Sequence, residues 1–100
     1  MKIFLDDVRE TPEGWARVFT VEELWVSYNL CLAYGGVVDA VSLDNDLGDG
    51  IPEGYTFLDE LEEKVANNPL YPIPKEIRIH SANPVARKRM QSVIDRLYNK

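Results

Sequence analysis

The sequence predicts a small α/β domain of three layers, with a parallel sheet of about four strands in the order 2-1-3-4 and helices on both faces. Short apolar runs alternate with segments of helical periodicity along the chain, which is typical of strands joined by crossover helices. The run at residues 37–43 is almost free of polar side chains, and this indicates a strand buried on both faces. The length of 100 residues suffices for one core, so residues 1–100 are expected to form a single domain.

The first half of the chain predicts two strands and a helix. One strand covers residues 2–6, and a short edge strand covers 15–19 after a turn-forming segment. Thr20 and Glu23 form a capping box that starts the helix, and the glycine pair at 35–36 ends it. Its buried face carries apolar side chains at helical spacing: Val21, Leu24, Trp25, Tyr28, Cys31 and Leu32.

The second half of the chain predicts two more strands and two more helices. The buried strand 37–43 is followed by a loop and by a helix at 54–67. After a proline-rich loop, the last strand ends at His80, and Asn83 and Pro84 open the final helix as N-cap and first helical residue. Both helices have an apolar inner face: Phe57, Leu58, Leu61 and Val65 in one, and Ala86, Met90, Val93, Ile94 and Leu97 in the other.

Acidic residues follow two of the predicted strands directly. Asp6 and Asp7 end the first strand, and Asp44 and Asp46 follow the strand 37–43. In the order 2-1-3-4, a trimmed flavodoxin-like sheet, these two strands are neighbours and flank the switch point where a ligand crevice opens. Carboxylates that converge there need a cation or bound protons. Hard oxygen ligands select Mg²⁺, Mn²⁺ or Ca²⁺ over zinc, and Mg²⁺ or Mn²⁺ is the predicted metal. The alternative is that the aspartates only end strands and cap turns.

A phosphate site is predicted on the opposite side of this crevice. Ser81 offers a hydroxyl, the helix that starts at Asn83 offers free backbone N–H groups, and Arg87 lies one turn into that helix. The alternative reading of Asn83 is that it only starts a helix.

His80 is the only histidine, so any imidazole proton transfer must use it. Carboxylates nearby are expected to raise its pKa, and His80 and Asp44 are therefore the predicted catalytic residues. A structural, hydrogen-bonding histidine is the alternative. Trp15 and Tyr55 are core candidates, although either could stack on a base.

Charge and composition restrict the partners. Residues 1–83 hold sixteen acidic side chains and six basic ones, which argues against a surface for duplex DNA. No apolar run approaches the length of a membrane span, and no secretory signal follows Met1. A cytoplasmic protein without membrane contact is expected, with the single Cys31 as a buried side chain. Protein partners are left open.

Three motifs in order resemble the cyclic-phosphate processing receiver-like domain family, a divergent branch of the response-regulator receiver fold found in bacteria and phages. They are Leu5-Asp6-Asp7-Val8-Arg9 with Pro12, Ser42-Leu43-Asp44-Asn45-Asp46-Leu47-Gly48 with Gly54, and His80-Ser81-Ala82-Asn83-Pro84 with Arg87 and Met90. The resemblance implies a metal–carboxylate pocket that binds or processes a cyclic phosphate on nucleotides or RNA ends, in a bacterial or phage-infected cell. Asn45 stands where the family often has His, and Ala86 where it often has Gly.

The leading functional prediction is a Mg²⁺- or Mn²⁺-dependent phosphoesterase-like domain acting on a cyclic or terminal phosphate. A second is a non-catalytic module that senses or sequesters a cyclic nucleotide. A third is a signalling switch phosphorylated on Asp44, since Asp6, Asp7 and Asp44 match the metal and phosphoacceptor aspartates of phosphorelay receivers and Ser81 matches their switch hydroxyl. Against the third, no fifth strand follows to bring in the lysine of that mechanism.

Overall fold

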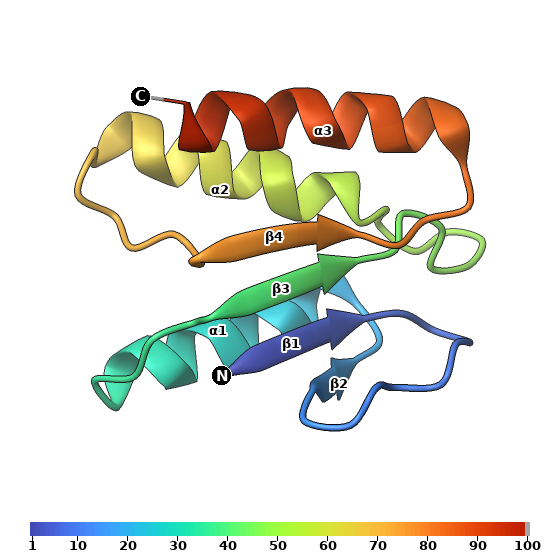
Figure 1. The fold of residues 1–100 in the computed structure, drawn as a ribbon, viewed down its shortest axis with the longest axis horizontal. Coiled ribbons are helices and arrows are strands. Elements are labelled where there is room, and N and C mark those ends of the chain that lie inside the picture. The colour runs from blue at the N-terminus through green and yellow to red at the C-terminus, as the bar shows by residue number, and fades with distance from the viewer. Residues whose placement is uncertain (100) are drawn as a thin grey trace.

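The computed structural model describes residues 1–99, which form four parallel strands and three helices (Figure 1). In chain order the elements are β1 (Lys2–Leu5), β2 (Ala16–Val18), α1 (Val21–Ala33), β3 (Ala40–Leu43), α2 (Tyr55–Asn67), β4 (Glu76–Ile79) and α3 (Pro84–Tyr98). The sheet order is β2-β1-β3-β4, with β2 at one edge. The predicted α/β class, the parallel sheet and the strand order are therefore confirmed.

The register of the sheet determines what meets at its carboxyl edge. Leu5 of β1 pairs with Leu43 of β3, and Leu43 pairs with Ile79 of β4. Each strand ends there, so the residue that follows it emerges at the same level. The next residues along the chain are Asp6, Asp44 and His80.

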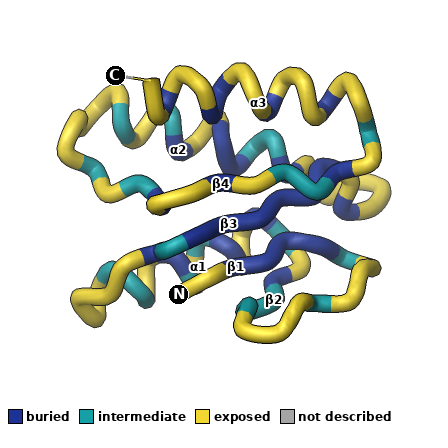
Figure 2. The backbone as a smooth tube through the Cα atoms, in the orientation of Figure 1, coloured by how far each residue is buried: buried dark blue, intermediate teal, exposed yellow. Residues whose placement is uncertain are grey.

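All three helices lie on one face of the sheet. The strand side chains on that face, among them Ile3, Leu5, Val41 and Leu43, belong to one core cluster with the buried side chains of all three helices. Neighbouring helices also touch each other: the rings of Trp25 in α1 and Phe57 in α2 are 4.7 Å apart. In Figure 2, β3 and most of β1 are coloured as buried, whereas much of the backbone at the edges of the molecule is coloured as exposed.

The expected helices on the second face are absent from residues 1–99, and the reason is topological. β1 and β2 are joined by a loop, so no helix forms between them. The connections from β2 to β3 and from β3 to β4 both cross the sheet in the same direction. Right-handed crossovers in the same direction place α1 and α2 on the same face, and α3 then packs beside α2.

Most of the predicted local features are present. Glu23 N–H donates to Thr20 Oγ1 over 3.1 Å, and Phe19 N–H donates to the Glu23 carboxylate over 2.7 Å, which completes the capping box. The predicted apolar face of α3 is buried throughout. In α1, Val21, Leu24 and Tyr28 are buried, whereas the other members of the predicted face are only partly buried. Cys31 is one of these, so the prediction of a buried cysteine was too strong.

The strand β3 is shorter than predicted. It begins at Ala40, while Val37 is 53% exposed and precedes the sheet. An apolar run shows that side chains avoid water, but only the pairing with β1 shows where the ladder begins. In residues 1–99, no helix is both long and apolar enough to cross a bilayer.

Candidate metal and phosphate site

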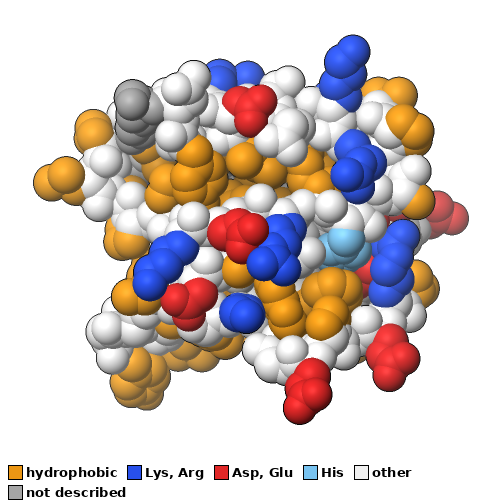
Figure 3. Space-filling view, viewed as in Figure 1, with side chains coloured by type: hydrophobic (Ala, Val, Ile, Leu, Met, Phe, Trp, Pro, Cys, Tyr) orange, Lys and Arg blue, Asp and Glu red, His pale blue; other side chains and the backbone are white. Residues whose placement is uncertain are grey.

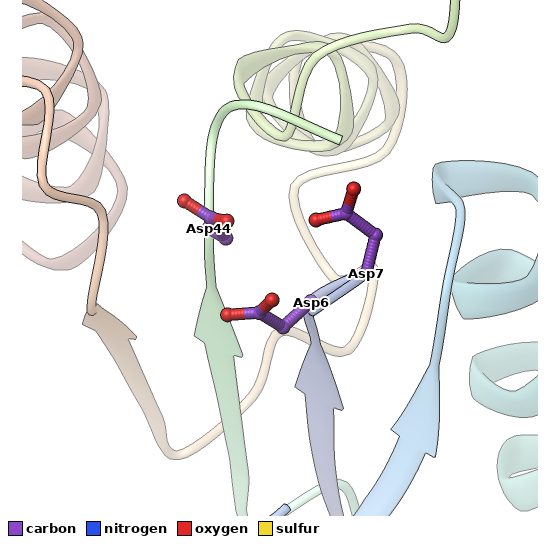
Figure 4. A group of neighbouring side chains, drawn as sticks. All are labelled: Asp6, Asp7 and Asp44. Atoms are coloured by element: carbon purple, nitrogen blue, oxygen red, sulfur yellow. The ribbon is translucent and has the colours of Figure 1, made fainter. Parts of the chain in front are cut away.

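Three carboxylates meet at the carboxyl edge of the sheet (Figure 4). Asp6 and Asp7 follow β1, Asp44 follows the adjacent β3, and one oxygen from each lies within 4.8 Å of the others. Asp6 is 0% exposed and Asp44 is 5% exposed, while Asp7 is half-buried. The adjacency of β1 and β3, predicted from the strand order, brings these residues together.

Asp6 is held in its charged form. Burial by itself raises the pKa of this carboxyl group, but the N–H groups of Arg9 and Val8, the Arg9 guanidinium and His80 outweigh it and lower the pKa to about 2. Oδ1 accepts the two backbone N–H groups over 2.9 and 2.8 Å, and Oδ2 accepts Arg9 Nη1 over 2.9 Å. Asp6 therefore remains a carboxylate throughout the physiological pH range.

Asp44 has the opposite electrostatic environment. Burial and the negative charge of Asp6 raise its pKa, and Arg9 offsets this only in part. Its Oδ1 accepts the N–H of Asn45 over 2.8 Å, and its Oδ2 lies 3.2 Å from Arg9 Nη1. Asp44 is thus the more basic of the two buried carboxylates.

Arg9 links the two carboxylates. The same Nη1 lies 2.9 Å from Asp6 Oδ2 and 3.2 Å from Asp44 Oδ2, so the guanidinium neutralises part of the charge that a bound cation would neutralise. No role was predicted for Arg9. Two features of the sequence could have indicated one: its position three residues after Asp6, and its place in the motif Leu5-Asp6-Asp7-Val8-Arg9.

His80 connects the carboxylates to the sheet. Its Nε2 lies 3.0 Å from Asp6 Oδ2, its Nδ1 lies 2.7 Å from Ser42 Oγ, and its ring stacks on Phe4 with centroids 4.3 Å apart. The pKa of His80 is lowered, because burial outweighs the attraction of Asp6 and Asp44. The prediction of a raised pKa was wrong. A neutral ring protonated on Nε2 satisfies both contacts, by donating to Asp6 and accepting from Ser42.

The loop after β3 is fixed by Asn45 and Gly54. Asn45 Oδ1 accepts the N–H of Tyr55 over 3.1 Å, and Asn45 O accepts the N–H of Gly54 over 2.9 Å. An added Cβ at Gly54 would lie 1.9 Å from the backbone oxygen of Asp44. Only glycine allows the start of α2 to approach Asp44 this closely.

Asp46, the fourth predicted metal ligand, lies apart from the cluster. It is exposed, and the three-carboxylate group does not include it. Trp15 and Tyr55, considered as base-stacking residues, are both partly buried. The Trp15 ring contacts Phe4, and the Arg89 guanidinium lies 4.1 Å from the centre of the Tyr55 ring.

The predicted phosphate-binding residues are largely engaged by the chain itself. Ser81 Oγ is buried and accepts the N–H of Asn83 over 3.2 Å. Asn83 Oδ1 accepts the N–H groups of Val85 and Ala86, each over 3.1 Å. These N–H groups are therefore not free for an anion, as they had been assumed to be. The phosphate-binding role of Ser81 and Asn83 stays a prediction.

Arg87 extends back from α3 to the end of β4. Its Nη1 donates to Ser81 O over 3.0 Å and to Ile79 O over 3.3 Å. The side chain is exposed, and a guanidinium has five N–H donors, so these two contacts leave others for a ligand.

Comparison with known proteins agrees with this geometry. The model of the cyclic-phosphate processing receiver domain matches residues 1–96. Comparison with curated proteins and with solved structures gives no match. The family match spans all seven elements to within two residues of the end of α3, and it includes every residue of the carboxylate cluster. The chain therefore belongs to the family of cyclic-phosphate processing receiver domains.

Proposed function

We propose that this domain is a divalent-metal-dependent phosphoesterase that hydrolyses a cyclic or terminal phosphate of a nucleotide or an RNA end. The observation that carries the proposal is the convergence of Asp6, Asp7 and Asp44 within 4.8 Å, two of them buried. Buried carboxylates this close repel each other, and a cation is the usual solution. Membership of the family supports a phosphate as the ligand.

The donor set fits Mg²⁺ or Mn²⁺. All three side chains offer hard oxygen atoms, and Mg²⁺ commonly uses one or two protein carboxylates while leaving other positions to water and phosphate. No hydrogen bond or ion pair within residues 1–99 engages the Asp7 carboxylate. Asp6, Asp7 and Asp44 would hold the cation, and Arg9 Nη1, which contacts Oδ2 of both Asp6 and Asp44, would compete with it for those two oxygens. When bound, the cation supplies a Lewis acid that stabilises charge on the phosphoryl oxygens.

Asp44 is the proposed general base. In hydrolysis of a 2′,3′-cyclic phosphate, a water oxygen bonds to phosphorus and one P–O bond to the ribose breaks. Asp44 accepts the proton of the water and returns it to the released ribose oxygen, which leaves a phosphomonoester. Asp44 accepts one backbone N–H, whereas Asp6 accepts two, so the backbone stabilises the anion of Asp44 less and favours it as the base of the pair.

Arg9 and His80 have supporting roles in this proposal. Arg9, released from one carboxylate, offers its N–H groups to a phosphoryl oxygen. His80, predicted as a proton-transfer group, has both ring nitrogens occupied by Asp6 and Ser42. Here it positions Asp6.

A second candidate is a metal-independent binding module for a cyclic nucleotide. The contacts of Arg9 favour it, because this residue already compensates the charges of Asp6 and Asp44 without a metal. Such a module would retain phosphate binding without turnover.

A ³¹P NMR time course tests the proposal. The substrates are 2′,3′-cyclic nucleotides and short RNAs with a cyclic-phosphate end, each with Mn²⁺ or with EDTA. Wild type is compared with Asp44→Asn and with Asp59→Asn, a matched control at an exposed aspartate of α2. A new monoester signal is expected in wild type and Asp59→Asn, only with Mn²⁺. Removal of a general base is expected to slow its appearance about 100-fold or more in Asp44→Asn.

Two other results would contradict parts of this proposal. A substrate signal that broadens or shifts in EDTA, with no monoester in Mn²⁺, contradicts the phosphoesterase and supports the binding module. A monoester that forms equally fast in Asp44→Asn rejects Asp44 as the base.

A further inference from the structure

We propose that the helix-free face of the sheet binds the unpaired bases of a single-stranded RNA whose terminal phosphate lies at the carboxylate cluster. This inference rests on the proposed function and specifies its substrate class. The surface is called the open face. By strand register it carries Lys2, Phe4, Arg17, Ser42, Glu76 and Arg78.

The charge of the open face differs from that of the whole chain. Three of its side chains are basic and one is acidic, whereas the chain has a formal net charge of −6. Arg78 is 55% exposed and lies 3.0 Å from Glu76, but its guanidinium has further donors beyond this pair. Figure 3, drawn from this side, shows basic and acidic side chains side by side, with basic and exposed apolar ones next to the single histidine. A phosphodiester backbone complements this local excess of positive charge.

Trp15 supplies an aromatic surface at the same place. Its ring packs against Phe4 at 76°, with centroids 6.3 Å apart. Lys2 Nζ and Arg78 Cζ lie 5.6 and 5.5 Å from the centre of the ring. Trp15 remains partly exposed. Aromatic rings flanked by cations are what proteins use to stack unpaired bases and hold the phosphates between them.

The open face is continuous with the carboxylate cluster through Phe4 and His80. Trp15 contacts Phe4, Phe4 stacks on His80, and His80 Nε2 lies 3.0 Å from Asp6. The two ring distances place Trp15 no more than about 11 Å from His80. A phosphate at the carboxylates therefore leaves the attached nucleosides over the open face.

The chemistry favours single strands over duplexes. A duplex hides the faces of its bases, so Trp15 could stack only on unpaired ones. The carboxylates of the cluster and the acidic loop after β3 would repel the phosphates of a second strand at the same edge.

The affinity for RNA tests this inference separately from turnover. The probe is a fluorescein-labelled, six-nucleotide single-stranded RNA with a 3′-hydroxyl end, which has no terminal phosphate to hydrolyse, and its affinity is measured by anisotropy. Arg78→Gln and Trp15→Leu are each expected to weaken binding about fivefold or more. Arg96→Gln, an exposed arginine of α3 that pairs with Glu62, is the matched control and should bind like wild type. In a Trp25→Phe protein, where Trp15 is the only tryptophan, the RNA should quench the fluorescence and inorganic phosphate should not.

The outcomes separate the two proposals. Weaker binding in both variants, without phosphate turnover in wild type, supports the open face and rejects the phosphoesterase. Turnover of a cyclic mononucleotide with wild-type RNA affinity in Arg78→Gln rejects the open face and retains the phosphoesterase. Equal affinity for a duplex of the same sequence also rejects base stacking. Arg78 is exposed, so its substitution keeps the test valid if Trp15→Leu does not fold.

Discussion

At the scale of single residues, the site shows how neighbouring groups of one chemical type acquire different properties. Asp6 and Asp44 follow adjacent strands and both are buried. The pKa of Asp6 falls because two backbone N–H groups, Arg9 and His80 outweigh its burial. The pKa of Asp44 rises because burial and the charge of Asp6 outweigh Arg9 and its one backbone N–H. The pair thus contains a fixed anion and a basic carboxylate, which is the division of roles that acid–base chemistry needs.

Gly54→Ala is expected to be the most damaging small substitution near the site. The added Cβ would lie 1.9 Å from the backbone oxygen of Asp44, and neither backbone can move without disturbing β3 or α2. We expect a loss of about 3 kcal/mol or more in the free energy of unfolding, measured by urea denaturation.

Gly14→Ala is the control for this substitution. Gly14 has a φ of +86°, but an added Cβ meets no atom within 4 Å. Its cost should come from backbone strain alone, about 1 kcal/mol. Equal losses in the two variants would show that the close approach to Asp44 does not constrain the fold.

At the scale of elements, the N-terminus of α3 is organised by its cap. Asn83 accepts two N–H groups of the first turn, and Arg87 donates to the carbonyl groups of Ile79 and Ser81. A helix start that satisfies its own donors is rigid, and it fixes the segment that follows β4. The sequence pair Asn83-Pro84 correctly predicted this helix start but did not reveal that its amides would be occupied.

Asn83→Ala should destabilise the domain by about 1–2 kcal/mol, because two N–H groups lose their acceptor. Ser92→Ala, in the same helix, removes an exposed hydroxyl that only donates to Lys88 O and should cost less than about 0.5 kcal/mol. Urea midpoints at unchanged m-values provide the comparison. If Asn83→Ala is as stable as Ser92→Ala, water replaces the cap and the helix start is not held by Asn83.

At the scale of the whole molecule, the two-layer arrangement of residues 1–99 leaves one sheet face without helices and places the carboxylates at the edge of the sheet. The buried side chains of the three helices form one core with the strand side chains of the covered face. A two-layer fold of this length buries less apolar area than a sheet covered by helices on both faces would. Binding of a metal or nucleotide is therefore expected to contribute measurably to the stability of the folded domain.

Mn²⁺ is expected to raise the melting temperature of wild type, because a ligand that binds only the folded state stabilises that state. At 100 times its Kd, such a ligand raises the free energy of unfolding by about 2.7 kcal/mol. Arg9→Gln should reach half of its maximal shift at a lower Mn²⁺ concentration, because the competing guanidinium is gone. Asp7→Asn should need more Mn²⁺ than wild type.

Differential scanning fluorimetry over a Mn²⁺ series measures these shifts. Arg96→Gln, a surface arginine remote from the cluster in the chain, serves as the matched control. A melting temperature unaffected by millimolar Mn²⁺ in all variants would contradict a metal site. A higher Mn²⁺ requirement in Arg9→Gln than in wild type would show that Arg9 supports the cation instead of competing with it.

The sequence by itself determined the elements, their order and the meeting of Asp6, Asp7 and Asp44. Periodicity, caps and glycines report local conformation, and parallel pairing places strand ends at one edge. The tertiary structure alone decided that Arg9 bridges Asp6 and Asp44 and that the pKa of His80 falls. The shared face of α1 and α2 follows from the strand order and right-handed crossovers, although helices on both faces had been predicted. Charge interactions depend on distances and burial between residues far apart in the chain, and periodicity shows that a side chain is buried without showing its partner.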